Sequence, residues 1–147
     1  MVDCWINVPA LADDDFVRNL ALALRFGTDG TRPYVAPQAH PVHAPLDPAL
    51  RLYLEYGNEN WNSGAGFLCL HYIRAIVERL DPGHPVMQPM PDSVWTAAWR
   101  YPAWRTTVIS DIFRGVFGDA AMMTRVRPVL RSEEHTSELQ SPCNLVC

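Results

Sequence analysis

Residues 52–62, with the sequence LYLEYGNENWN, indicate the fold class of the chain. Apolar or aromatic side chains recur at every second position from Leu52 to Tyr56, which predicts a β-strand. The pattern breaks at Gly57 and is followed by a polar tip that contains one tryptophan. A helix-like apolar run then covers residues 67–80. Strand, polar tip and helix in this order are typical of a βα unit in an α/β protein.

Asn58 and Glu59 lie at the polar tip, directly after the predicted strand. Ligands in α/β folds bind beyond the carboxyl ends of the strands, so this tip is where a substrate is expected. A structural role is an alternative. Asn58 is a good helix N-cap, and Glu59 would then lie in a first helical turn, where the helix dipole favours a carboxylate.

Residues 55–62, EYGNENWN, resemble the end of the fourth barrel strand in retaining glycoside hydrolases of clan A. The resemblance implies a (β/α)8 barrel in which Glu59 is the catalytic acid/base and Asn58 hydrogen-bonds the sugar 2-hydroxyl. The resemblance covers the catalytic acid/base but not the catalytic nucleophile, because the nucleophile in this clan lies on the seventh strand, outside the predicted fragment. Gly57, directly before the Asn-Glu pair, departs from the family pattern.

Two further residues are predicted to contact the substrate, Trp61 and Asn7. Aromatic rings stack on sugars, so Trp61 is either a stacking platform or a core aromatic, and the core role is favoured. The apolar run at residues 2–8 ends at Pro9 and predicts a buried parallel strand. Asn7 is therefore expected near its carboxyl end, on the ligand-binding side, unless it only satisfies the strand-to-loop turn.

The remaining pattern predicts alternating strands and helices around a long connection at residues 28–47. Alternation of this kind predicts a parallel sheet with right-handed crossovers. The predicted strands are 2–8, 51–57 and 126–130, and the predicted helices are 10–26, 67–80 and 105–117.

The segment 93–104 is rich in aromatic residues. Trp95 and Trp99 are one helical turn apart, and Tyr101 and Trp104 follow. Such a cluster would suit a carbohydrate site, but tryptophans at this spacing more often belong to the core side of a helix. We therefore expect them to be buried.

No metal or cofactor is expected. The aspartates at positions 13–15 crowd the first turn of a predicted helix, where capping explains them better than metal binding. His40 and His43 lie in the proline-rich loop at 28–47, where a solvated loop is favoured over a metal site. Cys4 and Cys69 are expected to be buried free thiols.

Composition limits the classes of partner. The 147 residues suffice for one modest domain, and 48% of them are hydrophobic, enough for a core. The net charge of −4 gives no reason to expect nucleic acid. Because no run of about 18 apolar residues occurs, no membrane span is expected, and the start of the chain does not predict a signal peptide. All 12 basic residues are arginine, which suggests a GC-rich, bacterial coding genome.

Residues 131–147 differ abruptly from the sequence before them. The segment 131–141 matches the in-frame translation of a common sequencing-library adapter. We therefore predict that the tail is non-native, disordered and without effect on stability, and exclude Cys143 and Cys147 from any disulfide or metal site.

Together these patterns predict that residues 1–130 are an α/β fragment of a (β/α)8 barrel, from about the third strand to the fifth; a complete barrel has about 250 residues. The resemblance implies a retaining hydrolase of a polysaccharide or oligosaccharide, with this fragment inactive alone. One alternative is a non-catalytic carbohydrate-binding or structural barrel. Another is an α/β enzyme of different chemistry, in which Asn58 and Glu59 only cap a helix.

Overall fold

The computed structural model of the protein describes residues 3–62, 64, 66 and 68–130. The predictions made for the tail at 131–147 fall outside these residues.

The centre of the fold is a three-stranded parallel sheet. Its strands are β1 (Cys4–Val8), β2 (Leu52–Tyr56) and β3 (Val126–Val129), and they lie side by side in the order β1-β2-β3. Leu52 sets the register, because it is opposite Cys4 on one side and Val126 on the other. The prediction of a parallel sheet with the segment 51–57 as its middle strand is confirmed.

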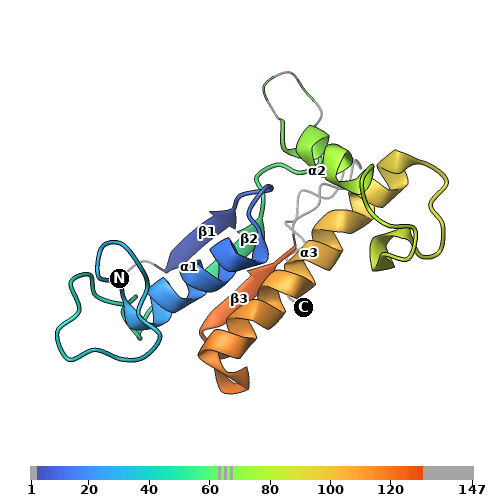
Figure 1. Ribbon diagram of the computed structural model, residues 1–147. Coiled ribbons are helices and arrows are strands. Elements are labelled where there is room, and N and C mark those ends of the chain that lie inside the picture. Colours follow the sequence, from blue (N-terminus) through green and yellow to red (C-terminus); the bar gives the residue numbers. More distant parts are fainter. Residues whose placement is uncertain (1–2, 63, 65, 67, 131–147) are drawn as a thin grey trace, which may run out of the picture.

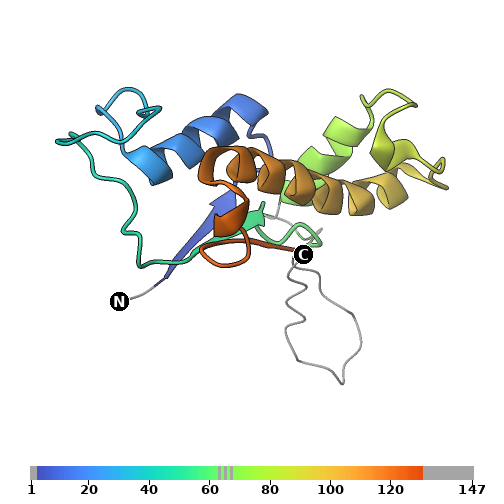
Figure 2. The same cartoon turned by 90° about the horizontal axis from the view of Figure 1, so that it is seen from below.

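The three helices of the described residues lie on the same side of the sheet (Figures 1 and 2). They are α1 (Asp14–Phe26), α2 (Cys69–Val77) and α3 (Val94–Phe117). Figure 1 shows α1 and α3 next to each other over the strands, with α2 beyond the carboxyl ends of the strands. Short 3-10 helices, η1 (Pro85–Met87) and η2 (Asp119–Ala121), precede and follow α3. The described residues therefore form a mixed α/β fold, and three strands do not by themselves close a barrel.

The helix α3 corrects the predicted boundary between segments 93–104 and 105–117, because the two form one helix of 24 residues. The Ser93 hydroxyl caps its start by accepting from the Thr96 N–H at 3.2 Å. Pro102 lies inside the helix and removes a backbone donor there. The helix continues because its buried face runs without interruption through the proline, with Ala98, Tyr101, Pro102, Arg105 and Ile109 all buried.

Two other helices are shorter than predicted. α1 begins at Asp14 rather than residue 10, because the Asp13 carboxylate caps it by accepting from the Phe16 N–H at 2.7 Å. This geometry confirms the predicted capping role for Asp13, and Asp14 and Asp15 lie in the first turn as predicted. α2 covers Cys69–Val77 of the predicted 67–80.

The core lies between the sheet and the helices. Strand side chains alternate in direction, so every second residue points to the helical layer. The largest fully buried side chains belong to both layers: Val8, Leu52, Leu54 and Val126 on the strands, and Val17, Ile73, Ile109 and Phe113 on the helices.

The opposite face of the sheet carries a row of planar side chains across the three strands. Trp5 and Tyr53 are opposite each other in the register, and their rings stack with centroids 5.3 Å apart. Arg127 is the next residue in the row, and its guanidinium lies 5.8 Å from the Tyr53 ring centroid. Trp5 remains 47% exposed, so this face is aromatic and partly accessible.

The expected burial of the tryptophans at the start of α3 is wrong. Trp95 is 37% exposed and Trp99 is 53% exposed. The buried face of this part of α3 is formed instead by Ala97, Ala98 and Tyr101. Periodicity correctly placed the two tryptophans near each other on one helix, but the face that packs against the rest of the fold is the one with small side chains.

None of the helices in the described ranges is both long and apolar enough to cross a membrane. Within the same ranges, no three His, Cys, Asp or Glu side chains gather as the ligands of a metal ion would.

Candidate functional site

The turn that follows β2 begins at Gly57, a position that requires glycine. Its N–H donates to the Val8 carbonyl at 2.7 Å, which extends the pairing of β1 and β2 by one residue. Its φ of +69° is in the left-handed region that favours glycine. An added Cβ would also lie 2.1 Å from Asn60 Oδ1 and 2.8 Å from Cys69 Sγ. The turn therefore requires Gly57, the residue at which the sequence departs from the pattern that residues 55–62 resemble.

The side chain of Asn60 holds the turn closed. Its Nδ2 donates to the carbonyl of Tyr56, the last residue of β2. Its Oδ1 accepts from Cys69 Sγ at 2.7 Å, at the first residue of α2. Burial raises the pKa of the Cys69 thiol, which keeps the thiol protonated and able to donate. One amide thus connects the strand, the turn and the following helix.

Asn58 and Asn7, both predicted to bind substrate, are brought together. Asn7 Nδ2 donates to Asn58 Oδ1 over 3.3 Å, and both side chains are exposed. Asn7 comes from β1 and Asn58 from the turn after β2, so the parallel pairing of the strands creates this contact. The result is an exposed pair of amides at the carboxyl end of the sheet.

Glu59 is half-exposed and is held in an unusual backbone conformation. Its φ is +49°, which is uncommon for a residue with a side chain. Strained positions of this kind are found preferentially at functional sites. The Glu59 carboxylate accepts from Asn62 Nδ2 at 2.8 Å through Oε2.

The alternative in which Asn58 and Glu59 cap a helix is wrong. α2 begins only at Cys69, and its N-cap position is Leu68, which makes no side-chain capping bond. The two residues lie instead in a turn outside any helix. Their side chains are therefore not held there by a helix dipole.

Trp61, the fourth predicted site residue, lies in the same turn and is half-buried. The structure thus places Asn58, Glu59 and Trp61 in one turn, and brings Asn7 to it from the neighbouring strand.

Glu55 is a site residue that the sequence reasoning missed. It is only 5% exposed, and its Oε2 accepts from the Trp5 indole N–H at 2.9 Å. In the register it is opposite Asn7, on the face of the sheet that the helices leave uncovered. The sequence signal was a charged residue in the middle of an otherwise apolar strand. A buried carboxylate therefore lies next to Asn7 on the neighbouring strand.

Tyr56 fixes the neighbouring β1–α1 connection. Its hydroxyl donates to the Ala10 carbonyl at 2.8 Å, and its side chain is almost fully buried. Burial raises the pKa of the Tyr56 phenol well above its ordinary value. The phenol is therefore a permanent donor at neutral pH and connects the two loops at this end of the sheet.

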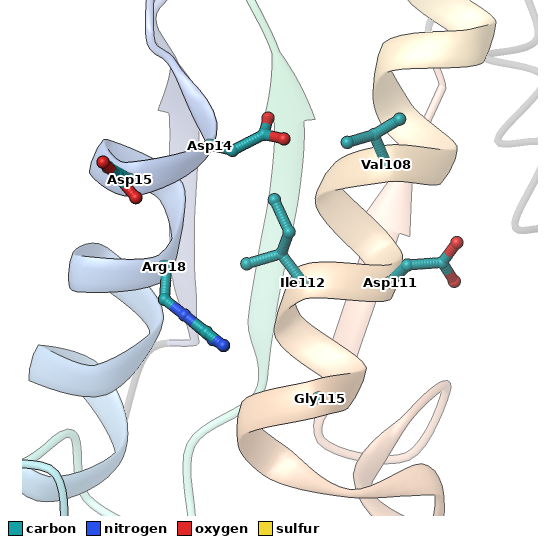
Figure 3. Close-up of a pocket in the computed structure, with 7 residues that line it drawn as sticks. All are labelled: Asp14, Asp15, Arg18, Val108, Asp111, Ile112 and Gly115. Carbon is teal, nitrogen blue, oxygen red and sulfur yellow. The ribbon is translucent and has the colours of Figure 1, made fainter.

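Among the described residues, the helical layer also contains pockets. One, of about 420 Å³, lies between α1 and α3, and Asp14 points toward α3 there (Figure 3). Another, of about 450 Å³, includes Tyr101 and Arg105. Neither is lined by Asn58 or Glu59. The turn, in contrast, joins the Glu59 carboxylate to several hydrogen-bonding amides.

Comparisons of the chain with protein families, curated proteins and solved structures found no match. A half-exposed carboxylate can exchange a proton with a ligand, and adjacent amides can both donate to and accept from hydroxyl groups.

Proposed function

We propose that the β2–α2 turn is the acid/base half of the active site of a retaining glycoside hydrolase. The observation that carries the proposal is the position of Glu59. It follows the central strand of a parallel sheet, is half-exposed, and has one carboxylate oxygen held by Asn62. The sequence resemblance of residues 55–62 gives this position the role of acid/base.

The chemistry assigned to the turn has two steps. In the first, Glu59 protonates the oxygen of the leaving sugar while a second carboxylate attacks the anomeric carbon. In the second, Glu59 removes a proton from water, which then displaces the enzyme carboxylate. The amides of Asn58 and Asn7 would bind sugar hydroxyls, and Trp61 would stack on a ring. In retaining enzymes the two carboxyl groups are about 5 Å apart.

The barrel architecture is part of the same proposal. Its support is that the three strands are parallel, are arranged in chain order, and have their helices on one face. Repetition of that unit closes a (β/α)8 barrel, with the present strands as about the third to the fifth. The nucleophile would then come from a later strand. The three-stranded unit alone is expected to show no turnover.

The test is the effect of Glu59→Ala in the complete barrel enzyme on two classes of substrate. A sugar alkoxide leaves slowly without a proton, whereas an acidic phenol leaves without help. General acid catalysis contributes about 10²–10⁴-fold, so natural glycosides should lose roughly that much in the first step and activated aryl glycosides much less. The activated substrate should also show a burst, because the slower second step lets the covalent intermediate accumulate.

Glu78→Ala is the matched control, since Glu78 is an exposed carboxylate that pairs with Arg74 of α2. This variant should keep full activity on both substrates. Equal losses for both substrates in Glu59→Ala, with no burst, would contradict the acid/base role.

A second candidate function is carbohydrate binding without catalysis. The exposed rings of Trp5, Trp95 and Trp99 favour it, because aromatic faces stack on sugars. The two functions differ in what a complete protein should do. A binding module would retain an oligosaccharide unchanged, and Glu59→Ala would alter only its affinity.

A further inference from the structure

The orientation of the Asn62 side chain is fixed by its two neighbours. Gly64 presents a backbone N–H, which can only donate, and it bonds Asn62 Oδ1 at 2.9 Å. The amide nitrogen of Asn62 therefore points the other way, toward Glu59 Oε2 at 2.8 Å. The Asn62 backbone N–H also donates to the Glu59 carbonyl at 2.9 Å, which closes the turn around the pair. The side chain is thus a directed donor to one carboxylate oxygen.

A directed donor determines which oxygen can carry a proton. The Asn62 amide nitrogen has only hydrogens to offer, so an O–H on the facing oxygen would meet another donor. Protonation of Glu59 is therefore favoured at Oε1, while Oε2 remains the acceptor of the Asn62 bond. The strained backbone of Glu59, with φ of +49°, and the closed turn hold the two side chains in this arrangement.

We propose that Asn62 is a positioning residue that places the acid proton of Glu59 on Oε1. This inference rests on the function proposed above. In the first step the proton moves from Oε1 to the glycosidic oxygen, the bond from that oxygen to the anomeric carbon breaks with its electron pair staying on the leaving oxygen, and the second carboxylate bonds the anomeric carbon. In the second step the oxygen of water bonds the anomeric carbon, the bond to the second carboxylate breaks with its electron pair staying on that carboxylate, and one proton of the water passes to Oε1. Asn62 contacts no reacting atom and acts only through Glu59.

The first experiment needs no activity. The side-chain NH₂ group of Asn62 gives its own pair of signals in a ¹⁵N–¹H spectrum. If it donates to Glu59, these signals should shift when the pH is lowered far enough to protonate Glu59. In Glu59→Ala the shift should disappear. The NH₂ signals of Asn60 are the internal control, because that amide donates to the Tyr56 carbonyl, which does not titrate.

The matched variant is Asn62→Asp. It has the same shape and keeps an oxygen to accept from the Gly64 N–H, but it replaces the donor to Glu59 by an acceptor. Circular dichroism and thermal melting will show whether the variant is folded. In the complete enzyme, Asn62→Asp should lower kcat on natural glycosides by about tenfold or more, with KM nearly unchanged and a small effect on activated aryl glycosides.

The outcomes separate the two proposals. If the NH₂ signals of Asn62 do not shift when Glu59 is protonated, the positioning role is overturned, whatever the activity. A folded Asn62→Asp enzyme with unchanged kcat on natural glycosides also overturns it. If the signals follow Glu59 but Glu59→Ala leaves hydrolysis intact, the proposed function fails, and the assignment of Asn62 to catalysis fails with it.

Discussion

The side chains of Asn7 and Asn58 are joined by a hydrogen bond of 3.3 Å although the residues are 51 positions apart. The bond crosses from the end of β1 to the turn after β2, so it reports directly on the geometry of the candidate site. Because both side chains are exposed, the bond contributes little to the free energy of unfolding. Its effect is on the local arrangement of the two amides at the candidate site.

Replacement of Asn7 by alanine should therefore leave the fold almost unchanged. We expect Asn7→Ala and Asn58→Ala each to lower the free energy of unfolding by about 1 kcal/mol or less. The interaction free energy between the two residues, obtained from the double variant, should be smaller than either single effect but not zero. Urea unfolding of the four proteins measures the cycle. Strictly additive effects would show that the two amides do not interact in solution.

Gly57→Ala should be clearly destabilising. The left-handed φ costs a residue with a Cβ about 1–2 kcal/mol, and the contact with the Asn60 amide at 2.1 Å adds to this. Gly115→Ala is the matched control, because Gly115 lies inside α3 and an added Cβ would meet nothing within 4 Å. That substitution should stabilise the protein by up to about 1 kcal/mol. Opposite signs in thermal melting are expected, and equal signs would contradict the described turn.

The ion pair between Arg105 and Asp14 should matter more than an exposed one. The Arg105 side chain is 6% exposed, and its guanidinium donates to Asp14 and, at 2.9 Å, to the Ala12 carbonyl. Asp14→Ala leaves a buried cation without its carboxylate, so a loss of about 1–3 kcal/mol is expected.

The control for this prediction is Asp111→Ala, which breaks an ion pair on the surface of α3. Arg114 and Asp111 are 45% and 69% exposed, and exposed pairs contribute at most about 1 kcal/mol. A loss in the control as large as that in Asp14→Ala would argue against the buried role of Arg105.

Stability should fall at alkaline pH because of buried phenols. Burial raises the pKa of both Tyr56 and Tyr101 above the ordinary value of 10. Above pH 10 the unfolded chain loses protons that the folded chain keeps, so the free energy of unfolding falls as the pH rises toward the folded pKa. Below pH 10 the contribution is complete. The pKa of the Cys69 thiol is also raised by burial, from an ordinary value of 9. This thiol therefore also lowers the free energy of unfolding as the pH rises above about 9.

Tyr56→Phe isolates one of these groups. It should cost about 0.5–1.5 kcal/mol at neutral pH, because the bond to the Ala10 carbonyl is lost, but it should make stability less dependent on pH above 10. Denaturant midpoints at pH 8, 9, 10 and 11 give both effects. An unchanged alkaline slope in the variant would show that Tyr56 does not titrate with folding.

The sheet could be predicted from the sequence because each strand is identified by the pattern of its own few residues. Alternation from Leu52 to Tyr56 and the apolar run before Pro9 each identify a strand, and the helical segments between them require parallel pairing. The same logic placed Asn7 and Asn58 at one end of the sheet. Their contact follows from the register rather than from any motif.

The internal bonds of the turn could not be predicted in this way. The Asn60 and Asn62 bonds depend on left-handed backbone at Gly57 and Glu59, and no periodic pattern encodes such angles. The exposure of Trp95 was missed for a related reason. Periodicity shows which residues share a helix face, but the choice of the packed face depends on elements distant in the sequence.

The parallel sheet also has a consequence for the speed of folding. No strand of it can pair with a neighbour in a tight hairpin, since a long connection separates each strand from the next. The bond from Arg105 to the Ala12 carbonyl spans 93 positions, so the helical layer also requires closure of a long loop. Chains dominated by such distant contacts fold in milliseconds to seconds rather than microseconds. The Asn7–Asn58 contact can form only after β1 and β2 have met, so a chain in which these two strands have not yet paired lacks this pair of amides at the end of the sheet.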